Sequence, residues 1–234
     1  MSHWKRGLKR LYRRSRRPLK RTKFYHRRYY RWARALLGDT IDILNQADID
    51  YHLDYGTLLG VVRGGDLISW DGDLDIGVLA TDWPALEATY DAFRERGWRV
   101  PHTKYQMGTD GLAWRAGDPK QITIATPVLL PTTLGRVRMD VVAKYADDDH
   151  LWWYCGHQPC RAPAAYFAGR REIAFAGRAT RIPTDAEAYL SLIYGDWRTP
   201  RRDYVTHRDD GSMLRLDTAG PDRAGTSDEL RNGS

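Results

Sequence analysis

Apolar and polar residues alternate over positions 73–78 of the chain, which read Asp-Leu-Asp-Ile-Gly-Val. A period of two predicts a β-strand, in which residues i and i+2 point to the same face of a sheet. Asp73 and Asp75 are therefore expected to project together. Leu74 and Ile76 are expected to point the opposite way, into a core.

A second strand with the same alternation is predicted at residues 136–143. Its apolar face is formed by Val137, Met139, Val141 and Ala143. Asp140 lies on the other face of this strand, with Arg136, Arg138 and Val142. A lone aspartate in a strand is more often a solvated surface residue, so the pattern alone leaves the role of Asp140 open.

Other periodic segments predict three helices and several short strands. Apolar residues recur at helical intervals from Tyr29 to Ala47, which predicts one amphipathic helix. A second helix is expected from Thr81 or Asp82 to Gly97, and a third from Thr184 to Gly195. Extended segments are expected at 49–53, 98–106, 112–115 and 121–125, with a hairpin-like segment at 150–160.

The aspartate pair at 73 and 75 needs an explanation, because like charges side by side on a strand repel and carboxylates are depleted in strands. A divalent hard cation bound by oxygen ligands would offset this repulsion. The alternative interpretation is a solvated strand end.

The residues before this strand are suited to a phosphate group. Gly56 lets the backbone approach a ligand closely, and a helix that opens just after Thr57 would offer free N–H groups to an anion. Arg63 could supply a planar fork for phosphate oxygens, and Gly64-Gly65 would turn the chain back. Together with the aspartates, this order predicts a site for a metal-bound phosphate compound.

These residues, in this order, resemble the LicD family of phosphocholine transferases and its fukutin relatives. The similar residues are Tyr55–Gly60, Arg63, Trp70-Asp71 and Asp73–Ile76, and near the other end Ile182-Pro183, Tyr189-Leu190 and Tyr194–Trp197. The chain departs from the family pattern at Gly72, where another aspartate is usual, and at Gly64, where histidine is usual.

The resemblance implies an α+β fold of the nucleotidyltransferase type, with a mixed sheet flanked by helices. It implies that Asp73, Asp75 and Asp140 are catalytic and hold Mg2+, with Mn2+ as an alternative. The expected substrate-binding residues are Gly56, Thr57, Arg63 and Asp71.

The implied reaction transfers phosphocholine, or a similar phospho-alcohol, from a CDP-linked donor to a hydroxyl of a cell-surface glycan and releases CMP. CDP-choline, CDP-ribitol and CDP-glycerol all fit the residues, and the acceptor could be lipopolysaccharide, teichoic acid or capsule, including a lipid-linked form. Asp140 is expected to accept the hydroxyl proton. Nucleotidyl transfer to RNA or a protein is the alternative reaction. A binding protein without activity is the third hypothesis, which the retained aspartate pair disfavours.

Charge is distributed unevenly along the 234 residues, whose net charge is +7. Residues 1–34 contain fifteen Lys and Arg and no acidic residue, which leaves 22 basic and 30 acidic residues in the remainder. The chain is therefore an acidic body, of net charge −8, with a basic N-terminal arm. An acidic body offers no groove for nucleic acid outside the arm.

The arm, residues 1–23, has Trp4, Leu8, Leu11 and Tyr12 at helical spacing among basic residues. This pattern favours an interfacial helix on an anionic membrane. A solvated tail, a transit peptide and a nucleic-acid-binding arm are the alternatives. A catalytic domain is expected at 24–207, followed by a disordered tail at 208–234.

The two cysteines are too few for a disulfide scaffold and suit a reducing cytosol. No apolar run approaches the ~20 residues of a membrane span. We therefore expect a cytoplasmic protein that the arm could hold at the inner membrane face. Cys155, Cys160, His150 and His157 are candidate zinc ligands, but their spacing matches no strong zinc motif.

Overall fold

A computed structural model of the protein describes residues 23–100, 105–108, 110–111, 113–127, 137–156 and 158–214. Residues 1–22 of the predicted arm (residues 1–23) lie outside this part of the chain. No helix within the described ranges is long and apolar enough to cross a membrane.

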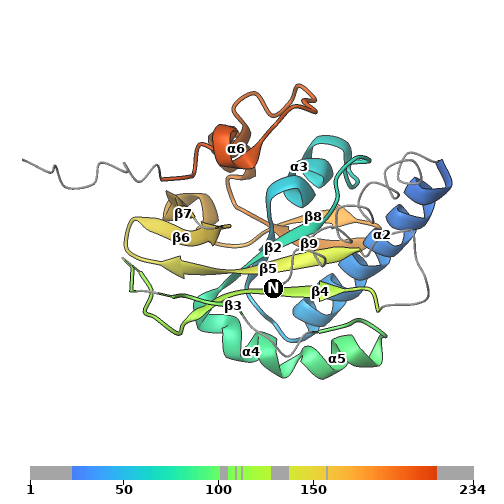
Figure 1. The fold of residues 1–234 in the computed structure, drawn as a ribbon, viewed down its shortest axis with the longest axis horizontal. Helices are drawn as coiled ribbons and strands as arrows, with labels where there is room; N and C mark the ends of the chain where they lie inside the picture. Colours follow the sequence, from blue (N-terminus) through green and yellow to red (C-terminus); the bar gives the residue numbers. More distant parts are fainter. Residues whose placement is uncertain are drawn as a thin grey trace, which may run out of the picture.

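A mixed sheet forms the centre of the fold (Figure 1). Its strand order is β1-β2-β5-β4-β3, and the hairpin β6–β7 continues from β5. β2 and β5 are parallel, and the other strand pairs are antiparallel. The bounds are β1 (Tyr51–Leu53), β2 (Leu74–Leu79), β3 (Tyr105–Gln106), β4 (Pro119–Ala125), β5 (Arg138–Ala146), β6 (His150–Cys155) and β7 (Gln158–Pro163).

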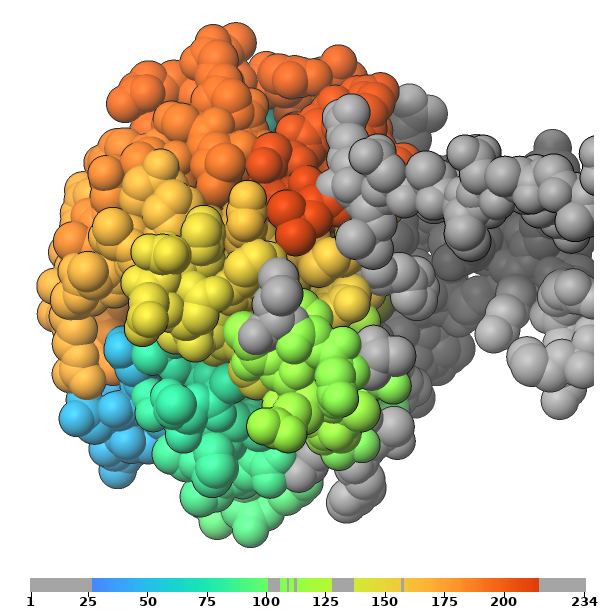
Figure 2. All heavy atoms as spheres, turned by 90° about the vertical axis from the view of Figure 1, so that its left-hand side faces the viewer, coloured from blue at the N-terminus to red at the C-terminus, as the bar shows by residue number. Residues whose placement is uncertain are grey.

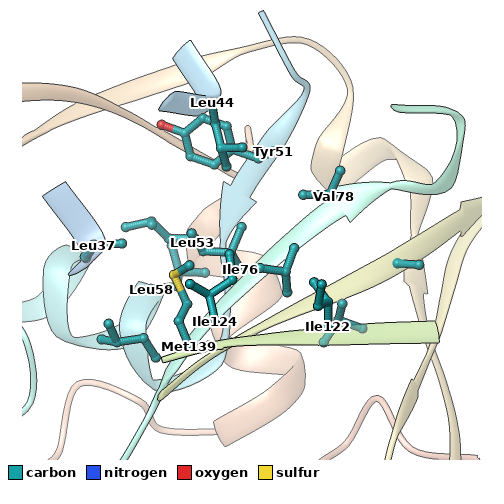
Figure 3. Packing of buried hydrophobic residues seen from close by; sticks show 14 of the residues in the cluster. Leu37, Leu44, Tyr51, Leu53, Leu58, Ile76, Val78, Ile122, Ile124 and Met139 are labelled. Atoms are coloured by element: carbon teal, nitrogen blue, oxygen red, sulfur yellow. The ribbon is translucent and has the colours of Figure 1, made fainter. Parts of the chain in front are cut away.

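Both strands predicted from alternation are present, and their apolar faces are buried. Leu74, Ile76 and Val78 of β2 are at most 2% exposed, as are Met139, Val141 and Ala143 of β5. Figure 3 shows Ile76 and Met139 packing with Leu53, Leu58 and Leu37 in one apolar cluster. One face of the sheet is thus the core, and the aspartates lie on the other.

Helices pack around this sheet. The predicted first helix is α2 (Lys23–Gln46), and its residues Leu36, Leu37, Ile41 and Leu44 are fully buried. In Figure 1, α4 (Trp83–Ala88) and α5 (Tyr90–Glu95) lie below the sheet, and α3 (Tyr55–Gly64) and α6 (Ala186–Tyr194) lie above it. The α+β class with a mixed sheet flanked by helices is therefore confirmed.

The helix predicted from Thr81 or Asp82 is broken into three pieces. A 3-10 turn (Ala80–Asp82) precedes α4, and α5 begins after Thr89. Asp82 does not cap the helix with its side chain. Its carboxylate instead accepts a hydrogen bond from the Asp50 N–H at 2.7 Å, which ties the helix start to the chain entering β1.

The prediction of extended segments at 98–106, 112–115 and 121–125 is only partly correct. β3 and β4 pair as expected, and Arg99 bridges to Ala125. Residues 113–115, however, are irregular rather than a strand. They contribute the buried Trp114, whose ring packs edge-on against Tyr145 and Tyr154.

The C-terminal third adds a second small sheet, β8 (Arg171–Phe175) with β9 (Arg178–Ile182), after a 3-10 turn (Ala164–Phe167). In α6 the Asp185 side chain accepts from the Ala188 N–H at 3.0 Å. Gly195, predicted as the end of this helix, follows it with φ +66°. Figure 2 shows teal, green, yellow and orange segments, far apart in the sequence, meeting on one surface.

The chain remains packed beyond residue 207, where a disordered tail was expected. A short helix, α7 (Thr206–Asp209), is followed by Asp210 and Ser212, which are buried, and Met213 bridges to Cys160. The packed part therefore extends at least to residue 214. Residues 215–234 lie beyond the described ranges.

Candidate active site

The sheet brings the predicted aspartates together. β2 and β5 are parallel neighbours in which Asp75 is the direct register partner of Asp140, and Asp73 immediately precedes β2. Asp71, Asp73, Asp75 and Asp140 all line one pocket of about 430 Å3, together with Gly56. Residues 65 positions apart thus share a pocket because two strands pair in this register.

Hydrogen bonds fix two of these aspartates. Asp140 accepts a hydrogen bond on Oδ1 from the Thr123 hydroxyl at 2.6 Å, across the β4–β5 pair. The Asp75 N–H donates to the Thr57 hydroxyl at 2.9 Å. Thr57 is 2% exposed, so this hydroxyl holds the start of β2 against α3. Thr123 was not singled out in the sequence, because its partner comes from a different strand.

The negative charges of the neighbouring carboxylates raise one another's pKa values. Burial, followed by the charge of Asp73, raises the pKa of Asp71 to about 6. Burial and the charge of Asp140 raise the pKa of Asp73, although Arg138, 3.7 Å away, opposes this. Burial and the neighbouring aspartates raise the pKa of Asp75 well above its usual range. It is therefore costly to keep these carboxylates ionised together unless a positively charged partner is bound.

This donor set fits a hard cation that the substrate helps to bind. Within the described residues, no three His, Cys, Asp or Glu side chains are grouped closely enough to hold a metal by themselves. Mg2+ is usually bound by one or two carboxylates plus substrate phosphates and water, rather than by a complete protein cage. Asp75 and Asp140 on adjacent strands, with Asp73 beside them, meet that smaller requirement.

Gly56 is required by the position of Asp71. A Cβ atom at residue 56 would lie 2.0 Å from Asp71 Oδ2. Gly56 and Thr57 belong to the first turn of α3, which begins at Tyr55, rather than to the turn before a helix that the sequence predicted. Tyr55 has φ +41°, an uncommon value for a residue with a side chain. Backbone strain at a helix start beside a pocket is a common feature of functional sites.

A buried ion pair lies behind the aspartates. Lys144, on the same face of β5 as Asp140, contacts Asp54 at 2.6 Å, and both side chains are fully buried. Asp54 also caps α3 through the Tyr55 N–H and accepts from the Tyr189 hydroxyl at 2.7 Å. Burial alone raises the pKa of Asp54, but Lys144 and the hydrogen bonds outweigh it and the pKa is lowered.

Arg63 is placed differently from the other predicted site residues. Its guanidinium donates to the main-chain oxygen of Trp197 at 3.1 Å. Arg63 is not among the described residues that line the pocket. It joins α3 to the segment after α6, and its predicted contact with phosphate remains a prediction.

Several aromatic and basic residues of the pocket were not identified from the sequence as site residues. Trp70, Tyr154, Tyr204, Arg201 and Arg202 line it. An exposed Trp70 three residues before Asp73 was a usable signal. Arg201 and Arg202 had none, because they follow the last motif and reach the pocket only through the tertiary fold.

Within the described residues, the two cysteines are not part of a cluster of three or more potential metal ligands. Cys155 lines the pocket and Cys160 is buried. Burial, followed by the charge of Asp210, raises the pKa of Cys155 to about 11 and that of Cys160 to about 12. Zinc binds cysteine as the thiolate, so zinc binding at this pair would have to release both protons. His157, the fourth candidate ligand, is not among the described residues.

The fold and the pocket can be compared with known proteins. A family model described as "LicD/FKTN/FKRP, nucleotidyltransferase domain" matches residues 48–185. An uncharacterized protein of Rickettsia typhi is 38% identical over 69 residues, 30% of this chain and 22% of that protein. Human and mouse "Ribitol 5-phosphate transferase FKRP" are each 43% identical over 42 residues, 18% of this chain and 8% of theirs.

The matched segments span less than a quarter of these relatives' own lengths. Among solved structures, ANT(2")-Ia in complex with adenylyl-2"-tobramycin has a TM-score of 0.44 and 16% identity, over 75% of this chain and 82% of that one. That likeness is too distant to support an argument. The family model, however, matches more than half of this chain and includes the whole aspartate motif. The protein therefore belongs to the LicD/FKTN/FKRP family and carries its nucleotidyltransferase domain.

Proposed function

We propose that the protein transfers a phospho-alcohol group from a CDP-linked donor to a hydroxyl of a glycan, with Mg2+ bound at the aspartates. The observation that carries this proposal is the parallel register that puts Asp75 beside Asp140 in a pocket shared with Asp71 and Asp73. A pocket that gathers four carboxylates is suited to a divalent ion and a phosphate compound.

Bound Mg2+ would neutralise charge on the diphosphate and on the phosphorus under attack. Asp75 and Asp140, with Asp73 beside them, would hold it together with the phosphates of the donor. The acceptor oxygen forms a bond to the phosphorus that carries the alcohol, the bond from that phosphorus to CMP breaks, and Asp140 takes the hydroxyl proton. Thr123 orients the Asp140 carboxylate for this role through their 2.6 Å hydrogen bond.

We propose choline, ribitol or glycerol as the alcohol of the donor. Choline is the group implied by the family's phosphocholine transferases. Ribitol phosphate is favoured by the similarity to the FKRP relatives, which are ribitol 5-phosphate transferases. CDP-glycerol completes the set to be tested. We propose glycans as acceptors, including lipid-linked ones, which the basic arm would approach at an anionic membrane. Mn2+ is a possible substitute for Mg2+.

Nucleotidyl transfer is the second candidate, because the matching domain is described as a nucleotidyltransferase domain. The same carboxylates would then support attack on the α-phosphorus of the nucleotide, by an RNA or protein acceptor. The two reactions leave different products. Phospho-alcohol transfer releases CMP, whereas cytidylyl transfer from the same donor releases the free phospho-alcohol.

The test is incubation with Mg2+, acceptor glycan and each of CDP-choline, CDP-ribitol and CDP-glycerol. We expect CMP release that depends on the acceptor and is abolished by EDTA. Asp75→Asn should abolish turnover while its thermal unfolding stays close to that of the wild type, since the change removes a charge that its neighbours repel. An active Asp75→Asn variant would exclude the proposed metal site.

A further inference from the structure

The pocket has basic residues on one part of its wall, in addition to the acidic residues from β2 and β5. Arg201 and Arg202 lie in the segment between α6 and α7, and both line the pocket. Among the described lining residues they are the only Lys or Arg. Both side chains are exposed, although they stand beside a pocket that contains four aspartates.

The segment that carries these arginines is attached to α6. The Tyr204 hydroxyl donates to the main-chain oxygen of Ile193 at 3.2 Å, and its ring packs on Tyr194 with centroids 4.6 Å apart. Arg63 holds the Trp197 carbonyl just before the segment. The arginines are therefore presented at the pocket by a fixed backbone rather than by a free tail.

The present partners of the two guanidinium groups are weak. Arg201 lies 3.4 Å from Asp203 and 4.0 Å from Asp209, and Asp203 is 77% exposed. Arg202 stacks over the Trp70 ring at 4.7 Å, and Trp70 is 43% exposed. Exposed ion pairs of this length contribute little. A phosphate ligand could replace them at small cost.

The two arginines can compensate the negative charge of a bound ligand. A nucleoside diphosphate compound brings two phosphate charges into a site whose aspartates already compensate a bound cation. Guanidinium groups are the side chains best suited to bind phosphate oxygens, through paired N–H donors. No other basic residue of the described pocket wall can supply that charge.

We propose that Arg201 and Arg202 bind the phosphates of the nucleotide donor, so that the segment after α6 is part of the donor site. This inference rests on the proposed function in taking the ligand to be a nucleoside diphosphate compound. The Arg202–Trp70 stack also joins this segment to the loop that leads to Asp71 and Asp73, so both sets of residues meet the same ligand.

The test is calorimetric titration of the full chain, in Mg2+, with three probes: CDP, inorganic pyrophosphate and cytidine. Replacement of both arginines, Arg201→Gln with Arg202→Gln, should weaken CDP and pyrophosphate binding by about tenfold or more, because charged hydrogen bonds are lost. Cytidine, which lacks phosphate, should bind both proteins alike. The pair Arg201→Lys with Arg202→Lys should restore part of the affinity.

Arg198→Gln is the matched control, because Arg198 lies in the same segment but stacks on Trp197 at 4.2 Å and is not a described lining residue. It should bind all three probes as the wild type does. A double glutamine variant within twofold of the wild type for CDP and pyrophosphate would overturn the inference. So would a wild-type chain that binds neither probe, or equal losses in the Arg198 control.

The outcome is separable from that of the transfer assay. Phosphate binding that needs the arginines, together with no transfer from any CDP-linked donor, supports the inference and contradicts the proposed reaction. If the wild type transfers the group and the double variant binds phosphate with unchanged affinity, the proposed reaction is supported and the inference about the arginines is contradicted.

Discussion

At the scale of single residues, the site depends on close approaches that only particular side chains allow. Gly56 and Asp71 illustrate this. Position 56 has no room for a methyl group, because the Asp71 carboxylate would lie 2.0 Å from it. Gly64, at the other end of the same helix, has nothing within 4 Å of the place where a Cβ would stand. The same substitution should therefore have different effects at the two ends of α3.

Gly56→Ala should lower the proposed transfer activity by about tenfold to 100-fold, because the Asp71 carboxylate must rotate out of its place beside the other aspartates of the pocket. The unfolding free energy should change by only about 1 kcal/mol, since the atom that must move is the end of a side chain. CMP release and thermal unfolding measure the two effects, with Gly64→Ala as the control. Wild-type activity in Gly56→Ala would show that Asp71 has no required position.

His52 gives a residue-scale prediction for stability. Its ring is buried against Phe167 at 4.9 Å, and burial lowers its pKa to about 4 from 6.5. Between these values the unfolded chain binds a proton that the folded chain excludes. The free energy of unfolding should therefore fall as the pH decreases from 6.5 to 4, by up to about 3 kcal/mol.

Urea unfolding of the wild type and His52→Gln at pH 7, 6, 5 and 4.5 measures this contribution. The variant is expected to be less stable at pH 7, but its stability should depend less on pH. The difference between the two curves isolates His52 from the other groups that titrate in acid. Parallel curves would contradict the burial of a neutral imidazole.

At the scale of elements, the local sequence pattern predicted the type of each element and its buried face, but not its tertiary contacts. Alternation correctly identified β2 and β5 and the face that carries each aspartate, because every second residue of a strand points to the core. The family resemblance then linked Asp140 to the other two. The position of Arg201 and Arg202 had no such signal, since it depends on how the chain returns over the pocket after α6.

The Asp54–Lys144 pair was also invisible in the sequence, although it joins three elements. Asp54 caps the start of α3, Lys144 lies on β5, and Tyr189 of α6 donates to Asp54. Lys144 Nζ also stands 3.5 Å from the centre of the Trp153 ring. From the sequence alone, a lysine on the same strand face as Asp140 would be expected to be exposed to solvent. Only the packing of α6 and β6 over that face buries it.

Lys144→Met should destabilise the fold by about 3–5 kcal/mol, because it leaves the Asp54 charge buried without its partner. Asp54→Asn combined with Lys144→Met should recover most of this loss, since an asparagine keeps an oxygen for the Tyr55 N–H while removing the charge. Urea unfolding of the wild type, both single variants and the double variant provides the cycle. A single Lys144→Met variant as stable as the wild type would show that the pair contributes nothing.

At the scale of the whole molecule, charge separates the chain into two parts. The described body gathers carboxylates at one pocket, while the first 34 residues carry fifteen Lys and Arg and no Asp or Glu. The body begins with α2, whose buried residues start near Ala33. We therefore expect the contribution of the basic residues before it to be separable from folding and from the proposed chemistry at the aspartates.

A chain that starts at residue 23 should keep the thermal unfolding midpoint and the activity on soluble acceptors of the full chain, but lose binding to anionic vesicles. The reason is electrostatic: each basic residue near such a surface contributes about 1 kcal/mol, and the truncation removes ten of them. Flotation with vesicles that contain phosphatidylserine measures the binding. Neutral phosphatidylcholine vesicles and raised salt, which screens the attraction, are the controls. If the full chain bound neutral and anionic vesicles equally, charge would not be the cause. If the two chains bound anionic vesicles equally, the body rather than the arm would carry the lipid contact.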